Sequence, residues 1–183
     1  MKNLFVRTSV IAAVAALSAG VASAQTTVAL PDTSQTTTLT ANVSEQARVT
    51  VPAGITFNVT NTSAITTAAA ASVTVDNIAL ATATKQLAIT ITPEALSFTS
   101  AGAGATWVSS DVTWNAATFS NAGVGSAGVL AGVATDQLVA TCAVNVAACS
   151  TTTLAFSLAA KPAVVNAGNH TLVIRWKFAS IGA

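Results

Sequence analysis

The sequence has few charged residues, one histidine, two cysteines and no tyrosine. Charged side chains make up 7% of its 183 residues, so no basic stripe is available to neutralise a row of phosphates. This excludes the usual electrostatic mode of nucleic-acid binding. The single histidine, His170, excludes metal sites that need two imidazoles and constrains Ser-His-Asp catalysis. Next to Gly168 and Asn169, it is expected to be a polar residue at a strand edge.

Several motifs that carry chemistry are also missing. The chain contains no G-x-S-x-G nucleophile turn, no C-x-x-C redox pair and no D-x-D-x-D-G calcium loop. Gly123-Val124-Gly125 lacks the third glycine and the strand-then-helix setting of a dinucleotide site, so residues 121–132 are expected to form a loop or irregular edge. The six acidic residues are scattered singly along the chain. We therefore expect no enzymatic activity, no cofactor and no metal.

The first 24 residues have the pattern of a secretory signal. Lys2 and Arg7 supply the basic region, residues 10–17 the apolar region, and Ala22-Ser23-Ala24 the cleavage site. The apolar stretch is too short for a permanent membrane-spanning helix. We expect a mature chain that begins at Gln25, has no membrane span, and is exported to the periplasm, cell surface or extracellular space.

Removing this signal leaves five basic and six acidic residues, so the expected net charge of the mature chain is −1. Threonine occurs 28 times after residue 24. β-Branched side chains suit a pleated sheet, and the threonine hydroxyls can lie at its solvated positions. Residues 25–183 have the length of one β domain, in which residues 25–40 are a candidate N-terminal extension.

Apolar and polar residues alternate with period two in several segments, as in half-buried strands. Leu87, Ile89 and Ile91 share one face of one segment, and the residues between them are alanine or threonine. The longest alternation runs from His170 to Phe178. Other expected strands are 39–43, 55–60, 72–80, 106–114, 137–142 and 154–158. These segments predict an all-β fold, an antiparallel immunoglobulin-like β-sandwich of about 7–9 strands.

Cys142 and Cys149 are the only cysteines. In an oxidising compartment they are expected to form a structural disulfide across a hairpin or a loop between neighbouring strands. The chain-entropy model assigns a loop this short roughly 2 to 3 kcal/mol of stabilisation.

Two tryptophans lie close together at Trp107 and Trp114. If both indoles project from one surface, they could stack on sugar rings, with Asp111 and Asn115 as hydrogen-bonding partners. This would make a glycan the ligand. The alternative, which we favour, is that the indoles fill the sandwich core, as is also expected of Trp176, because large aromatics dominate core burial.

The order of signal, threonine-rich strands, one disulfide and a long alternating final strand resembles bacterial exported β-sandwich subunits. These include pilin- or fimbria-like and spore-coat-U-like proteins. The resemblance implies that an incomplete sandwich accepts a strand from a neighbouring subunit. Residues 26–43 could supply that strand, or could form a leader followed by an ordinary first strand. The candidate donor residues are Val28, Leu30, Leu39, Ala41 and Val43.

Two functions follow as hypotheses. The first is an exported, non-enzymatic structural protein of the cell surface or extracellular matrix, whose partner is a further copy of itself in a filament or pilus-like assembly. The second is a secreted carbohydrate-binding module that uses exposed tryptophans.

Overall fold

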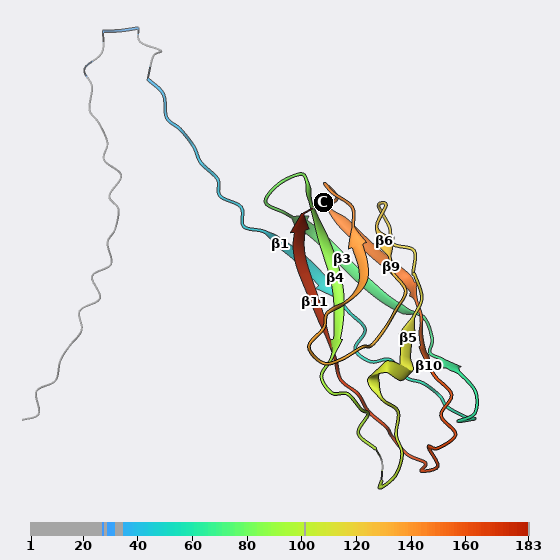
Figure 1. Ribbon diagram of the computed structural model, residues 1–183. Helices are drawn as coiled ribbons and strands as arrows, with labels where there is room; N and C mark the ends of the chain where they lie inside the picture. Colours follow the sequence, from blue (N-terminus) through green and yellow to red (C-terminus); the bar gives the residue numbers. More distant parts are fainter. Residues whose placement is uncertain (1–26, 28, 32–34, 101, 183) are drawn as a thin grey trace, which may run out of the picture. The chain divides into compact units, whose positions relative to one another are not determined.

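A computed structural model describes residues 27, 29–31, 35–100 and 102–182 (Figure 1). The predicted signal, residues 1–24, and the candidate donor Val28 lie outside the described residues. The chain divides into two units, Met1–Thr40 and Ala41–Ala183. The described residues of the first unit contain no helix or strand, and each of them is exposed.

The regular secondary structure of the second unit is almost entirely antiparallel strand. Its longest strands are β3 (Ala71–Ala79), β4 (Lys85–Pro93), β9 (Ala148–Leu154) and β11 (Ile174–Gly182). The shorter ones are β1 (Gln46–Thr50), β2 (Thr66–Thr67), β5 (Val112–Trp114), β6 (Val124–Gly125), β7 (Gly128–Val129), β8 (Gln137–Cys142) and β10 (Phe156–Leu158). A 3₁₀ turn, η1 (Ser109–Asp111), precedes β5. The prediction of an antiparallel all-β fold is confirmed.

Three sheets form the second unit, with strand orders β1-β3-β9, β2-β10-β5-β7 and β11-β4-β8-β6. The first two run on from one another, because only residues 68–70 separate β2 from β3 and only Ala155 separates β9 from β10. We describe them together as the first layer and the β11-β4-β8-β6 sheet as the second. In Figure 1, β4 lies beside β11, to which it is paired over its whole length.

The core lies between inward-facing residues of the two layers. Val73, Val75 and Leu154 of the first layer and Ile89 and Ile91 of the second have no solvent exposure. Together with neighbouring side chains they form one hydrophobic cluster. The period-two alternation of β3 therefore has the origin expected of a half-buried strand, whereas β4 is also buried on its other face, at Ala88 and Thr92.

The strand bounds differ from the predicted ones in several places. The described part of the chain has eleven strands rather than 7–9, because five of them have only two or three residues. The final strand covers 174–182 rather than 170–178. Within the segment 106–114, only residues 112–114 form a strand. Residues 39–43 and 55–60 form no strand. Residues 124–125 and 128–129, within the stretch expected to form a loop or irregular edge, are short strands at the edges of their sheets.

Candidate functional site

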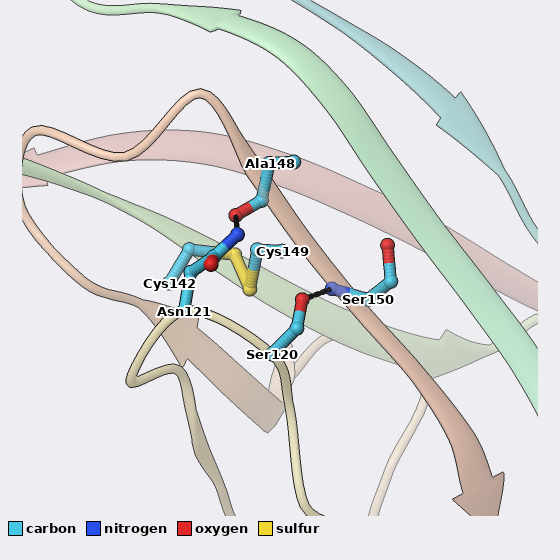
Figure 2. Close-up of a disulfide and its surroundings, with 6 residues drawn as sticks. All are labelled: Ser120, Asn121, Cys142, Ala148, Cys149 and Ser150. Carbon is cyan, nitrogen blue, oxygen red and sulfur yellow. Dashed lines mark hydrogen bonds between the residues drawn. A yellow bond between two sulfur atoms is a disulfide. The ribbon is translucent and has the colours of Figure 1, made fainter.

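One side of the sandwich is closed by a disulfide between the layers. Cys142 ends β8 in the second layer and Cys149 lies in β9 in the first, with a Cα–Cα distance of 5.8 Å (Figure 2). The predicted disulfide is confirmed, and its loop joins neighbouring strands. It does not span a hairpin, because β8 and β9 belong to different sheets. The bond therefore ties the two layers together.

The loop 119–123 covers the outer edge of β9 beside this disulfide (Figure 2). The Ser120 backbone N–H donates to the carbonyl of Ser150 at 2.8 Å, and the Ser150 N–H donates to Ser120 Oγ at 2.9 Å. Asn121 Nδ2 donates to the carbonyl of Ala148 at 2.8 Å. Since an uncovered sheet edge offers its backbone groups to other strands, these hydrogen bonds block edge pairing at β9.

The glycine-rich segment continues this closure. β6 pairs with β8 in the second layer and β7 pairs with β5 in the first, so residues 124–129 cross from layer to layer. A Cβ atom added at Gly125 would lie 1.9 Å from the carbonyl oxygen of Ala117, and one at Gly128 would lie 2.3 Å from the Trp114 ring. The glycines are therefore required by close packing rather than by loop flexibility.

The opposite side of the sandwich is open. Strand β1 pairs with β3 alone and β11 with β4 alone, so each is an edge strand of its layer. Val49, which lies opposite the fully buried Val75, is 41% exposed. Trp176 and Phe178, on the core-facing side of β11, are only partly buried. Apolar side chains that would be covered in a complete sandwich are thus accessible along this side.

The chain beyond β1 forms the first rim of this opening, residues 51–60. Ile55, Phe57 and Val59 pack against the core and alternate with exposed residues, as in a strand. Among the described residues, however, the backbone groups of 52–60 make one backbone hydrogen bond, from Val59 N–H to Phe57 O at 3.1 Å. The predicted strand 55–60 is therefore wrong as a paired strand, because it has side-chain alternation without a neighbouring ladder.

Residues 164–176 form the second rim. Its outer edge is attached to the chain after β4, where Glu94 N–H donates to Val173 O at 2.9 Å and Thr99 pairs with Thr171. Leu172 and Ile174 turn toward the core and are partly buried. Val165 and Val173 are 81% and 67% exposed. This rim is held from outside and leaves apolar side chains uncovered.

Between the rims lies a groove of about 1040 Å³. Its floor consists of buried side chains of the first layer and the segments beside it, namely Trp107, Val112, Leu130, Phe156 and Leu158. None of the residues that line the groove is an aspartate, glutamate, lysine or arginine. The groove therefore has an apolar floor and no acidic, lysine or arginine side chain in its lining.

The candidate tryptophan platform is not on the surface. Trp107 and Trp114 are each 4% exposed. Trp107 Nε1 donates to the carbonyl of Ala159 at 2.9 Å, and Trp114 Nε1 donates to that of Ser126 at 2.8 Å. The favoured interpretation, that these indoles fill the core, is confirmed, and the alternative of an exposed sugar-stacking pair is wrong, since the N–H groups of the buried rings are already bonded.

The two proposed polar partners of that platform also have structural roles. Asp111 Oδ2 accepts hydrogen bonds from the Val108 N–H at 2.8 Å and from Lys161 Nζ at 2.7 Å. Asn115 accepts from the Ala155 N–H at 2.8 Å and donates to the carbonyl of Thr153 at 3.1 Å. Both side chains hold neighbouring segments together and are not directed at a shared ligand site.

His170 lines the groove and is held on three sides. Its Nδ1 lies 2.9 Å from Thr106 Oγ1 and its Nε2 lies 3.1 Å from the carbonyl of Asn166. Its ring meets the Trp107 ring edge-on, with centroids 5.3 Å apart. These contacts attach the second rim to the floor, and among the described residues no nucleophile and acid accompany the imidazole in a catalytic arrangement.

Glu45 immediately precedes β1, which leads into the first rim. Its Oε1 accepts hydrogen bonds from the Ala81 N–H at 2.7 Å, from Lys85 Nζ at 3.1 Å and from Ser180 Oγ at 3.1 Å. The Ala81 N–H, followed by the Lys85 ammonium, holds the pKa of the Glu45 carboxyl below its ordinary value of 4.5. Sequence reasoning missed this residue, because its three partners are far away along the chain.

The pKa values of two further carboxyls are also lowered. The Arg48 guanidinium lowers the pKa of Asp76, and the Lys177 ammonium, with the Thr92 hydroxyl, lowers that of Asp136. The ordinary value for both is 3.8. The folded chain therefore binds fewer protons than the unfolded chain in acid, so stability is fully present above these ordinary values and is lost as the pH falls through the depressed ones.

We accordingly expect the melting temperature to be nearly constant from about pH 7 to pH 5 and to fall as the pH drops below about 4.5, following the linkage between proton binding and stability. Thermal unfolding followed by circular dichroism across this range measures it. The triple variant Glu45→Gln, Asp76→Asn, Asp136→Asn should melt lower at pH 7 and show a shallower decline in acid. A decline as steep as that of the wild type would contradict the assignment to these carboxyls.

The described candidate donor residues are all exposed. Leu39 is 92% and Val43 75% exposed, and Ala41 between them is exposed as well. Leu30 is 88% exposed and precedes Pro31. Residues 36–44 contain no charged side chain. An uncharged segment with alternating apolar residues thus lies without helix or strand structure immediately before Glu45 and β1.

Comparisons with protein-family models, curated proteins and solved structures found no match to this chain. Within the described residues, no three histidine, cysteine, aspartate or glutamate side chains gather as a metal-binding group. The same residues contain no helix with the length and apolarity needed to cross a bilayer.

Proposed function

We propose that this protein is an exported, non-enzymatic structural subunit of the cell surface or extracellular matrix, and that it assembles into filaments by β-strand addition. The observation that supports this most directly is the groove between residues 51–60 and 164–176, which is apolar along its floor. Its first rim has backbone groups that pair with no neighbouring strand among the described residues. Strand addition supplies such groups with main-chain hydrogen bonds.

The groove favours one kind of occupant. Ten residues of extended chain, the length of the first rim, span about 33 Å at 3.3 Å per residue. An added strand places every second side chain on the floor, so those side chains must be apolar. The lining carries no charged side chain, and the occupant must therefore be uncharged on its buried face, since an unpaired buried charge is costly.

We infer that this occupant is residues 36–44 of a second copy. Leu39, Ala41 and Val43 lie at alternate positions in an uncharged run, and all three are exposed. The alternation at Val28 and Leu30 ends at Pro31, whose nitrogen cannot donate to a ladder. Because the donor and the groove are different surfaces of one chain, each added subunit leaves another groove to be filled, and the assembly grows as an open filament.

The test compares two pairs of substitutions in the mature chain, residues 25–183. Leu39→Asp with Val43→Asp places charges on the apolar face of the donor and should abolish assembly, leaving monomers. Thr38→Asp with Thr40→Asp adds the same charge to the same segment on its other face and should leave filaments in place. Light scattering after size-exclusion chromatography, with electron microscopy, distinguishes the two results.

Filaments that persist in the Leu39→Asp, Val43→Asp chain would reject residues 36–44 as the donor. A wild-type chain that stays monomeric over a wide range of concentrations, and on the surface of producing cells, would reject self-assembly altogether. Unchanged thermal melting of both variants serves as the control for folding, because the substituted side chains are exposed or precede the first strand.

A further inference from the structure

Hydrogen bonds join chain segments on either side of the two rims in the sequence. Before the first rim, Glu45 Oε1 accepts from Ser180 Oγ of β11, after the second rim, and from Lys85 Nζ, at 3.1 Å each. Before the second rim, the Lys161 N–H donates to the carbonyl of Thr62, after the first rim, at 2.6 Å. The residues that line the groove on its two rims, 51–60 and 164–176, lie between these points in the sequence.

The contacts of Glu45 join the two edge strands. Glu45 directly precedes β1 of the first layer, whereas Ser180 belongs to β11 and Lys85 to β4 of the second. The Glu45 carboxylate also accepts from the Ala81 N–H in the connection between β3 and β4. A strand longer than the first rim would have to enter between β1 and β11, which the Glu45–Ser180 hydrogen bond joins, and would break that bond.

The Glu45 side chain is not deeply buried, but its carboxylate is a charged hydrogen-bond acceptor. The Glu45 and Lys85 side chains are each 35% exposed. A hydrogen bond to a charged group contributes more than one between neutral groups. Three donors on one carboxylate oxygen also fix its position, because they come from three different segments of the chain. We call Glu45, Ala81, Lys85 and Ser180 the Glu45 clasp.

We infer that the Glu45 clasp is the end stop of the groove and determines the length of strand that it accepts. This inference rests on the proposed function, because it needs a strand that binds in the groove. With the clasp closed, the groove pairs with at most about ten residues, which matches the nine residues 36–44. With the clasp open, the free edges of β1 and β11 become available for further pairing.

The experiment measures how peptide affinity depends on length. It uses the mature Leu39→Asp, Val43→Asp chain, whose own segment does not compete for the groove. One labelled peptide has the sequence of residues 36–44. Two longer peptides extend this sequence by five alternating threonine and valine residues, one peptide at the N-terminal end and the other at the C-terminal end. The clasp is opened by Ser180→Ala, which removes the hydrogen bond between Ser180 and Glu45, and by Glu45→Ala, which removes every hydrogen bond of the clasp. Asp76→Ala is the matched control, because Asp76 pairs with Arg48 and does not contact β11.

With the clasp intact, and in the Asp76→Ala control, the long peptides should bind no more tightly than the nine-residue peptide. In the clasp variants, one of the long peptides should bind about tenfold more tightly, since each additional hydrogen bond contributes about 0.5–1.5 kcal/mol. Hydrogen exchange should then show new protection at 46–50 and 177–182.

The possible failures are distinguishable. If the nine-residue peptide binds but the clasp variants treat long and short peptides alike, the inference about Glu45 is overturned and the proposed function stands. The same holds if the intact chain already prefers a long peptide tenfold. If no peptide binds the intact chain, both the end stop and strand addition are rejected.

Discussion

Phe156→Ala should lower the free energy of unfolding by about 3–5 kcal/mol, the range for truncating a buried phenylalanine. Phe156 is 1% exposed, and its ring lies 6.2 Å from that of Trp114 at a tilt of 46°. It lies in β10, between β2 and β5, and lines the floor of the groove. Urea unfolding of the monomeric Leu39→Asp, Val43→Asp chain measures the loss by linear extrapolation.

Phe178→Ala is the matched control for this change. Phe178 lies on the core-facing side of β11 but is only partly buried, because β11 is the edge of its sheet. The same atoms are removed from a less buried site, so the loss should be clearly smaller than for Phe156. Equal losses would mean that Phe178 is as well covered as Phe156, and would contradict its partial burial at the sheet edge.

Gly125→Ala is expected to cost about 1–3 kcal/mol or more, because overpacking displaces side chains and backbone. The new Cβ would lie 1.9 Å from the carbonyl oxygen of Ala117 and 2.9 Å from the Ala117 nitrogen. These are backbone atoms, which cannot move aside as the end of a flexible side chain can. The crossing between the layers at 124–129 must therefore shift, and the melting temperature should fall by several degrees.

Gly132→Ala provides the comparison, since no atom lies within 4 Å of the Cβ that it would add. Both substitutions reduce the conformational entropy of the unfolded chain by a similar amount, so their difference isolates the packing conflict. Gly132→Ala should change stability by no more than about 0.5 kcal/mol. If the two variants melt together, the close packing at Gly125 is disproved.

The strands that sequence reasoning predicted best are those whose period-two pattern reflects burial of one face. The segment 72–80 corresponds closely to β3, in which Val73 and Val75 are buried and the residue between them is not. The same criterion failed for 55–60, which has the alternation but no paired neighbour. Periodicity reports which side chains face the core, whereas a strand also needs a hydrogen-bonding partner, and that partner comes from elsewhere in the chain.

The candidate sites also differ in how far the sequence could predict them. The disulfide followed from having two cysteines and no other thiols, because no alternative pairing exists within the chain. The tryptophan platform depended on where two side chains point, and both point inward. The glycines at 125 and 128 were expected to indicate a loop or an irregular edge; they lie in edge strands, where they allow backbone and a tryptophan ring to pack closely.

Composition and alternation were enough to predict an antiparallel all-β fold and its single disulfide, because both follow from local residue preferences and from simple counting. Tertiary structure decided that one side of the sandwich is closed by Ser120, Asn121 and the disulfide and that the other has a groove between residues 51–60 and 164–176. It also brought Glu45 to Ser180, 135 residues further along the chain. Such contacts depend on how the layers are stacked and connected, which period-two patterns within single strands do not specify.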